Sequence, residues 1–331
     1  MRPPAFWFTP PDRPALAARL LAPLGAAYAA ATARRVARPG ARLGVPVICV
    51  GNISAGGAGK TPTVIALAQR LAARGVAAHV VTRGHGGRLA GPVRVDERRH
   101  TADDVGDEPL LLAAFAPTWV SKNRLAGGRT AVAAGAQAIL LDDGFQNPAL
   151  TKDLSIVVVD AGVGWGNGRV LPAGPLREPV AAGLLRTDMV LSIGPEAAQA
   201  TFAADWGAAI AVPLLTGVLR PLPMGMDWYG ERVIAFAGIG RPGKFFATLR
   251  EAGAEIVREV ALDDHQPFAR ALLQRLESEA QATGAQLVTT EKDAARLPKW
   301  FRPKVLAFPV RLVLDDWAPL DAALDQLFPK A

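Results

Sequence analysis

The chain is poor in residue types that mark several classes of protein. Its 331 residues include one cysteine, four histidines and two tyrosines, and only 6% of them are aromatic. A single cysteine excludes a disulfide framework or a cysteine metal site within one chain, so packing is the expected role of Cys49. The scarcity of aromatic residues and the lack of a recognisable nucleic-acid module argue against a nucleic-acid partner.

The N-terminal region also lacks a hydrophobic run of membrane-spanning length. The uncharged run at residues 20–33 is too short and too rich in alanine to cross a bilayer. Small residues follow it, as they do in a signal peptide. We reject a signal peptide because a phosphate-binding loop, which needs cytosolic nucleotide, begins shortly afterwards.

What the chain does have is hydrophobic residues and positive charge. Half of its residues are hydrophobic, and its length leaves room for two modest domains. The formal net charge of +7 favours an anionic partner, such as anionic lipid or a phosphorylated substrate. No feature of the sequence predicts an obligate protein partner.

The stretch at residues 51–61, Gly-Asn-Ile-Ser-Ala-Gly-Gly-Ala-Gly-Lys-Thr, has the layout of a P-loop. It follows an apolar run at residues 45–50 that predicts a buried strand, and it precedes a predicted helix at residues 62–70. Glycine-rich backbone and the start of a helix together form an anion site. The predicted ATP-binding residues are Ser54, Ala55, Gly56, Gly57, Ala58, Gly59, Lys60 and Thr61.

The P-loop assigns roles to two side chains and predicts a metal site. Lys60 is expected to reach the β- and γ-phosphates of ATP, and the Thr61 hydroxyl to bind Mg²⁺. An apolar run at residues 136–141 ends in Asp142 and Asp143, which is the position from which a carboxylate reaches that Mg²⁺. Asp142 and Asp143 are therefore further metal candidates, and spacing does not decide between them.

Four more candidate residues stand where strands end or helices begin. Arg83 follows a predicted strand at residues 76–82 and would face a nucleotide crevice in an open α/β sheet. Asp107 and Glu108 begin a predicted helix, where acidic residues are also favoured by the helix dipole alone. His265 follows two carboxylates after a strand at residues 255–261, which makes it a candidate for catalysis.

Residues 1–44 differ from the rest of the chain. Leucines and a tyrosine recur every four residues and share one helix face: Leu16, Leu20, Leu24 and Tyr28. Arginines precede and follow this face: Arg13, Arg19, Arg34, Arg35, Arg38 and Arg42. We interpret the region as a membrane-associated amphipathic helix, with a helix packed on the body of the protein as the alternative.

Strands that alternate with helices predict an α/β fold of the P-loop NTPase class, with a doubly wound and mostly parallel sheet. Its domain would cover residues 45–215, including strands at 118–120, 154–160, 188–193 and 209–212. A connector at residues 213–229 would lead into a second, smaller α/β domain within residues 216–331. Strands are expected in that domain at 232–238, 255–261 and 305–314, and a strand followed by a loop is expected at 286–293.

Seven segments, taken together and in order, resemble the tetraacyldisaccharide 4′-kinase family, the lipid A 4′-kinases of Gram-negative bacteria. They are residues 50–62, 82–87, 105–109, 142–146, 174–178, 263–265 and 290–293. The resemblance implies ATP and Mg²⁺, a β-ribbon between the domains, and transfer to the 4′-hydroxyl of a tetraacyldisaccharide 1-phosphate. It also implies peripheral attachment to the cytoplasmic face of the inner membrane.

The resemblance assigns residues as well. It implies that Asp107 is a catalytic base paired with His265. Contacts to phosphates or acceptor are implied for Arg83, Glu108, Arg124, Gln146, Arg177 and Glu178. The chain departs from the family at His85, where tyrosine is usual, and at Asn147, where a histidine that could titrate is usual. The rival function is a nucleotide-switched, membrane-associated regulatory ATPase, which would need no Asp107–His265 pair.

Overall fold

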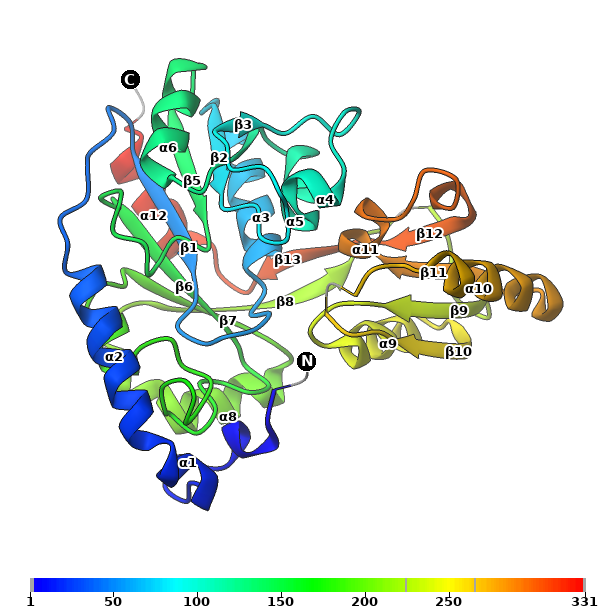
Figure 1. Ribbon diagram of the computed structural model, residues 1–331, viewed down its shortest axis with the longest axis horizontal. Coiled ribbons are helices and arrows are strands. Elements are labelled where there is room, and N and C mark those ends of the chain that lie inside the picture. Colours follow the sequence, from blue (N-terminus) through cyan, green and yellow to red (C-terminus); the bar gives the residue numbers. More distant parts are fainter. Residues whose placement is uncertain (1–2, 224, 265, 330–331) are drawn as a thin grey trace.

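Two sheets organise the chain in the computed structural model, which describes residues 3–223, 225–264 and 266–329 (Figure 1). The larger sheet has nine strands in the order β13-β8-β7-β6-β1-β5-β2-β4-β3. Neighbouring strands run parallel except in the pairs β3–β4 and β8–β13. The strands are β1 Val47–Gly51, β2 Ala78–Thr82, β3 Val93–Arg94, β4 Thr118–Val120, β5 Ala138–Asp142, β6 Leu154–Asp160, β7 Met189–Ile193, β8 Leu214–Pro221 and β13 Val310–Leu314.

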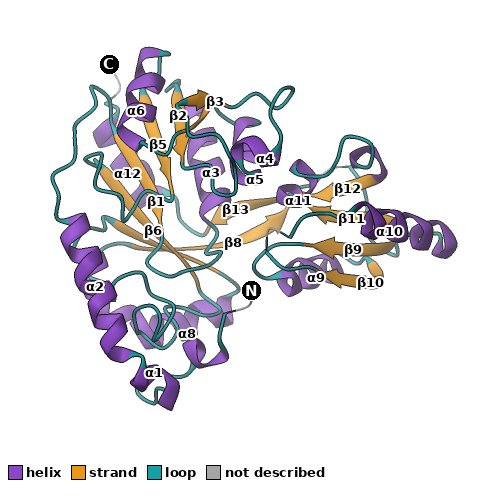
Figure 2. Cartoon of the chain, viewed as in Figure 1, coloured by secondary structure: helices purple, strands orange, loops and turns teal. Residues whose placement is uncertain are grey.

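Helices cover both faces of the larger sheet (Figure 2). On one face, α3 (Lys60–Ala73) and α12 (Ala318–Leu327) share an apolar core with the strands. On the other face, α6 (Arg124–Ala133) and α8 (Glu196–Trp206) contribute to a second core. Shorter helices precede or link the strands: α4 Ala102–Val105, α5 Asp107–Ala113 and α7 Val180–Leu184. The predicted doubly wound fold is confirmed.

The smaller sheet has four parallel strands in the order β10-β9-β11-β12. These strands are β9 Arg232–Ala237, β10 Glu255–Ala261, β11 Gln286–Thr290 and β12 Val305–Phe308. Phenylalanines of α9 (Pro242–Glu251) pack on one face, and leucines of α10 (Arg270–Thr283) pack on the other. The short helix α11 (Glu291–Ala295) replaces the loop expected after β11.

The chain passes between the sheets along an antiparallel ribbon of β8 and β13, visible between the two halves in Figure 1. The expected strand at 209–212 was wrong, because the strand is β8, within the stretch expected to be a connector. The single strand expected at 305–314 is two strands, one in each sheet. Pro309 separates them because it cannot donate a ladder hydrogen bond. The division between the sheets therefore differs from the expected boundary at residue 216.

The N-terminal region packs on the larger domain through small residues. It comprises a 3₁₀ turn η1 (Ala5–Phe8), α1 (Leu16–Leu20) and α2 (Ala22–Val36). Ala18 and Thr32 are buried, and a Cβ at Gly25 would lie 2.8 Å from the Val170 carbonyl oxygen, so only glycine fits. Within the described part of the chain, no helix has both the length and the hydropathy required to cross a membrane.

Candidate active site

The P-loop lies at the carboxyl edge of the larger sheet, between β1 and α3. Gly59 ends the loop with φ 93°, and a Cβ there would lie 2.7 Å from Cδ1 of Ile193. Both the backbone conformation and the close approach therefore require glycine at this position. Lys60 and Thr61 follow directly and form the first turn of α3, at the positive end of the helix dipole.

The segment at residues 175–177 is hydrogen-bonded to the P-loop. The Ala55 N–H donates to the Pro175 carbonyl oxygen at 2.7 Å, and the Arg177 N–H donates to the Ile53 carbonyl oxygen at 2.7 Å. Within the described residues, the N–H groups of residues 56–59 donate no hydrogen bond to the chain. The loop thus presents unused backbone donors in a fixed frame, which is what binding of phosphate oxygens requires.

Asp143 joins the P-loop lysine to an arginine. Its Oδ1 lies 3.7 Å from the Lys60 ammonium and accepts a hydrogen bond from Arg177 at 2.7 Å. Burial alone would raise the pKa of Asp143, but the charges of Lys60 and Arg177 outweigh it and lower the pKa. Asp143 is therefore ionised, and its charge is balanced by the Lys60 ammonium and the Arg177 guanidinium. Its φ of 51° is uncommon for a residue with a side chain.

Asp142, the last residue of β5, has a different environment. It is buried; its Oδ2 accepts a hydrogen bond from the Thr82 hydroxyl at 3.1 Å, whereas its Oδ1 has no hydrogen-bond partner among the described residues. Burial raises the pKa of Asp142 to about 7, and the charges of Glu108 and Asp143 contribute. A buried carboxylate with an unused oxygen is well suited to a cation.

Two of the arginines expected to contact phosphates or the acceptor, Arg83 and Arg124, differ in exposure. Arg124 is buried and donates to the carbonyl oxygens of Ser121 at 2.9 Å and Asp142 at 3.3 Å. Burial lowers the pKa of Arg124, and the nearby charge of Arg83 adds to this effect. Arg83 itself is exposed, so its guanidinium is accessible to a ligand. Arg124 instead fixes the end of β5 that carries the carboxylate.

Gln146 and Glu178 form a buried network beside the P-loop. The Gln146 amide nitrogen donates to the Asn52 carbonyl oxygen and to Glu178 Oε1, both at 2.9 Å. Arg186, which the sequence did not suggest, pairs with the other oxygen of Glu178. Asn147 caps a turn by accepting from the Ala149 N–H at 2.9 Å. The structure therefore gives Gln146 and Glu178 contacts that support the loop.

Asp107 and Glu108 begin α5, and a lysine from the other sheet faces them. The Lys292 ammonium lies 3.2 Å from Glu108 Oε1 and 3.8 Å from Asp107 Oδ2. Lys292 lies on α11, and its contacts tie the two domains together at this point. The helix start predicted for Asp107 and Glu108 is confirmed. His265 lies outside the described residues.

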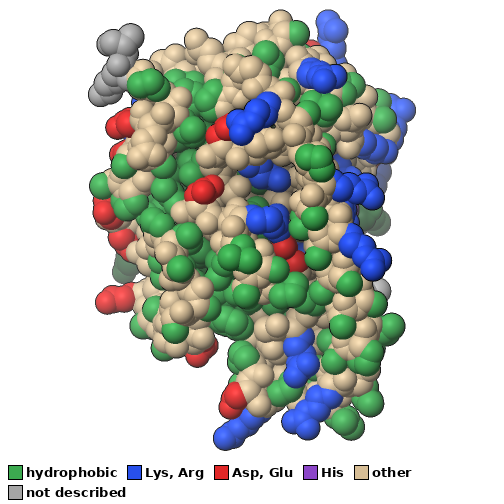
Figure 3. Space-filling view, turned by 90° about the vertical axis from the view of Figure 1, so that its left-hand side faces the viewer, with side chains coloured by type: hydrophobic (Ala, Val, Ile, Leu, Met, Phe, Trp, Pro, Cys, Tyr) green, Lys and Arg blue, Asp and Glu red, His purple; other side chains and the backbone are tan. Residues whose placement is uncertain are grey.

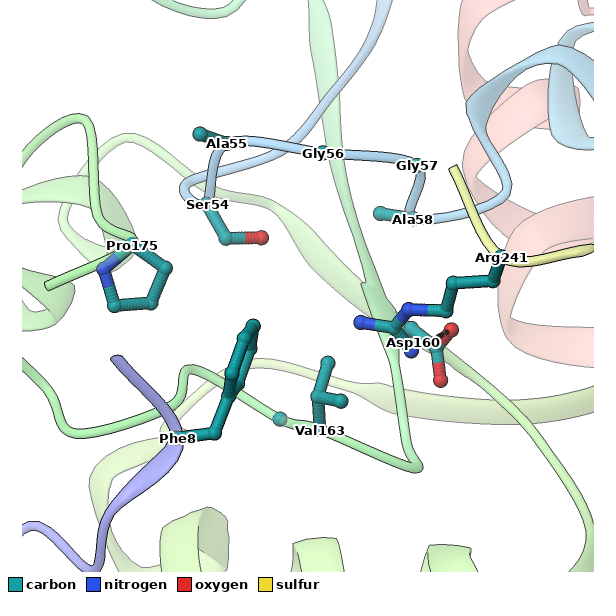
Figure 4. A pocket seen from close by; sticks show the side chains of 11 residues that line it. Phe8, Ser54, Ala55, Gly56, Gly57, Ala58, Asp160, Val163, Pro175 and Arg241 are labelled. Atoms are coloured by element: carbon teal, nitrogen blue, oxygen red, sulfur yellow. Dashed lines mark hydrogen bonds and ion pairs between the residues drawn. The ribbon is translucent and has the colours of Figure 1, made fainter. Parts of the chain in front are cut away.

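A shallow hollow lies beneath the P-loop, where Arg241 of the second domain approaches the larger one (Figure 4). Its lining includes Phe8 of η1, loop residues 54–58, Asp160 at the end of β6, and Arg241 at the start of α9. Arg241 and Lys244 each donate to Asp160 Oδ2 at 2.6 Å. These pairs, like those of Lys292, join residues far apart in sequence, and for that reason the sequence did not indicate them.

The structure thus brings most of the predicted residues to one edge of the sheet. The P-loop, Asp143, Arg177, Gln146 and Glu178 form one chain of contacts. Asp142 and Arg124 adjoin it, and Glu108 is close enough to affect the charge of Asp142. This edge can bind a polyphosphate, hold a cation beside it and place carboxylates near an acceptor.

Comparison with known proteins agrees with this geometry. The family described as Tetraacyldisaccharide-1-P 4'-kinase matches residues 17–329. A protein named tetraacyldisaccharide 4'-kinase from Dinoroseobacter shibae is 67% identical over 333 residues, covering 100% of this chain and 99% of the relative. Another of that name, from Jannaschia sp., is 62% identical over 328 residues, covering 99% of each chain.

The fold also matches a solved structure. The crystal structure of LpxK from Aquifex aeolicus in complex with ATP aligns with a TM-score of 0.73 at 25% sequence identity. The alignment covers 94% of this chain and 99% of the other. The similarity therefore extends over both sheets and is not confined to the P-loop.

Proposed function

The chain belongs to the tetraacyldisaccharide-1-P 4'-kinase family, and we propose that it transfers the γ-phosphate of ATP to the 4′-hydroxyl of a tetraacyldisaccharide 1-phosphate, a lipid A precursor. The full-length identity to named kinases carries this conclusion. It also leaves no observation in favour of a regulatory ATPase.

The P-loop is the site for the phosphates of ATP. Unused N–H groups at residues 56–59, the start of α3 and the Lys60 ammonium supply donors and positive charge there. Lys60 is held near Asp143 and would exchange that partner for the β- and γ-phosphates. Arg177, which lies beside Asp143, and the exposed Arg83 would neutralise further phosphate charge.

The residues present fit a magnesium ion. The unused Oδ1 of Asp142 and the Thr61 hydroxyl, at the start of α3, are the oxygens we propose for it, with Asp143 as a further candidate. No cluster of three or more potential metal ligands occurs among the described residues. Mg²⁺ usually binds through one or two carboxylates together with phosphate oxygens and water, so these oxygens would suffice as the protein ligands. When bound, the ion would neutralise phosphate charge.

Asp107 is the proposed base for the 4′-hydroxyl proton. It is buried at the start of α5, and its Oδ1 accepts from the Glu108 N–H at 2.9 Å, which fixes the carboxylate. The pairing with His265 rests on the family resemblance and stays a proposal. A base within hydrogen-bond reach of the hydroxyl would contribute to the rate without a covalent intermediate.

We further propose peripheral attachment to the cytoplasmic face of the inner membrane, through an apolar stripe of the N-terminal helices. The stripe consists of Leu16, Leu20, Leu24 and Tyr28, residues that are 71%, 71%, 59% and 40% exposed. The opposite, small-residue side packs on the body, as the alternative interpretation expected, and the outward exposure of the stripe is what supports the membrane proposal. Figure 3 shows exposed hydrophobic side chains on this face, with lysine and arginine side chains along one border. Such a surface suits anionic lipid.

The test is acceptor-dependent turnover. Purified protein is incubated with ATP and Mg²⁺, with and without the tetraacyldisaccharide 1-phosphate, and ADP release is measured. We expect release only with the acceptor, in step with gain of one phosphate by the lipid. Equal ADP release in the absence of acceptor would favour an ATPase and contradict the proposal.

A further inference from the structure

Lys292 lies among the acidic residues of the proposed catalytic centre, although it comes from the second domain. Its ammonium is 3.2 Å from Glu108 Oε1, 3.8 Å from Asp107 Oδ2 and 4.0 Å from Asp264 Oδ1. The side chain is 19% exposed, so much of it is removed from water. A single ammonium thus serves three carboxylates from α5 and from the loop after β10.

The balance of charges shows that Lys292 is a permanent cation in this place. Burial alone would lower its pKa, but the carboxylates, Glu108 foremost, outweigh burial and raise it. Without the ammonium, carboxylates would face one another in a partly buried space. Loss of one partner of a buried ion pair is costly because the other charge is left uncompensated.

The same charge influences the rest of the site. Glu108 is one of the groups that raise the pKa of Asp142, so a cation on Glu108 limits the negative charge that Asp142 experiences. A site that binds a polyphosphate and a lipid phosphate brings further negative charge to these carboxylates, and like charges repel. The positive charge of Lys292 reduces that repulsion. None of these contacts involves the P-loop.

We propose that Lys292 is a positioning residue, which fixes the Asp107 and Glu108 carboxylates toward the acceptor hydroxyl from across the domain boundary. The inference rests on the proposed role of Asp107. If Lys292 has this role, correct placement of the Asp107 carboxylate depends on the packing of α11 against α5. The expected loss on removing Lys292 is therefore in turnover and not in ATP binding.

The chain supplies a matched control on the same short helix. Glu291, next to Lys292, pairs with Arg311 of β13 at 2.6 Å and 3.0 Å and contacts neither Asp107 nor Glu108 in any described interaction. Glu291→Gln therefore weakens the docking of α11 without altering the charge beside the base. Lys292→Met removes the ammonium and keeps most of the apolar length.

The experiment compares kcat and KM for ATP at saturating lipid acceptor. We expect Lys292→Met to lower kcat by at least about tenfold, because small displacements of a base are costly, while KM for ATP changes less than about threefold. Lys292→Arg should retain more activity than Lys292→Met, and Glu291→Gln should stay near wild type. If Lys292→Met and Glu291→Gln behave alike, Lys292 has only a structural role and the proposal fails.

A chemical rescue covers the case in which Lys292→Met folds poorly. In Lys292→Cys, alkylation with 2-bromoethylamine restores an ammonium at nearly the original length, whereas iodoacetamide adds a neutral group. The native Cys49 is buried, and burial raises its pKa to about 12, so it does not compete. Recovery of kcat with the amine alone supports the proposal, and equal results with both reagents overturn it.

One further comparison separates this inference from the function of Asp107. In an Asp107→Asn background, Lys292→Met should cause little additional loss, because residues that act as one unit are not additive. Multiplied losses would show that Lys292 acts elsewhere and would overturn the proposal. Full activity of Asp107→Asn alone would instead refute the role of the base.

Discussion

Replacement of Asp142 by asparagine should stabilise the nucleotide-free protein while it removes activity. Burial raises the pKa of Asp142 from its ordinary value of 3.8 to about 7. At a pH between those two values, Asp142 has lost its proton in the unfolded chain but still holds it in the folded protein. Stability therefore falls as pH rises through this window, and it levels off above the folded pKa.

The size of the stability penalty follows from the difference between the pKa values of Asp142 in the folded and unfolded states. Each pH unit within the window costs about 1.4 kcal/mol, so the full penalty at pH 8 is on the order of 4 kcal/mol. Asparagine keeps the shape and carries no charge, so it should escape this cost. The advantage of Asp142→Asn over wild type should grow by about 2 kcal/mol between pH 5 and pH 7 and level off near pH 8.

The assay is urea unfolding of both proteins at pH 5, 6, 7 and 8, followed by tryptophan fluorescence. The difference between the proteins cancels groups that titrate alike in both. Asp143→Asn is the mirrored control, because the pKa of Asp143 is lowered by Lys60 and Arg177 despite burial. That variant should be less stable than wild type throughout this range. A difference for Asp142→Asn that does not change with pH would refute the reasoning.

Three further outcomes are expected. Lys60→Ala should largely abolish transfer at saturating ATP, because it removes the charge on the β- and γ-phosphates; near-normal turnover would contradict the P-loop assignment. Asp107→Ala should lower the transfer rate by at least about a hundredfold. The double variant with His265→Ala should be little slower than the less active of the two single variants, and rate losses that multiply fully would contradict the proposed dyad. Changing Leu16, Leu20 and Leu24 together to glutamine should weaken binding to anionic vesicles by at least about tenfold, because the apolar area that lipid would bury is removed. The transfer rate measured without vesicles should not fall. Leu185→Gln, a change of an 88% exposed leucine elsewhere, is its control, and unchanged vesicle binding by the triple variant would make the stripe irrelevant.

The sequence predicted those parts of the site that depend on local pattern. Glycine spacing, an apolar strand before it and Lys-Thr after it suffice to locate a P-loop, since all its donors come from one segment. The carboxylates at the end of β5 and the helix start at Asp107 are likewise local signals. Parallel strands bring such ends to one edge, so the cluster itself could be expected.

The parts that were missed depend on contacts between distant segments. Strand β8 is rich in leucine and ends in proline, and it is a strand because β7 pairs with its first half and β13, more than 85 residues away, pairs with its second half. Lys292 stands in a motif that was recognised, but its partners lie on a helix of the other domain. The four-residue repeat at Leu16 predicted one face of a helix, and only packing of the small residues behind it decided that this face is exposed.

The central claim is that phosphate is transferred to one particular hydroxyl of a lipid disaccharide. It is tested most directly by NMR of the product, with phosphorus-to-proton correlation to locate the new phosphate. The account predicts a new phosphomonoester signal coupled to the proton at the 4′ position, formed by wild type and absent with Lys60→Ala. A phosphate found at another position, or ATP consumed without a phosphorylated lipid, would contradict it.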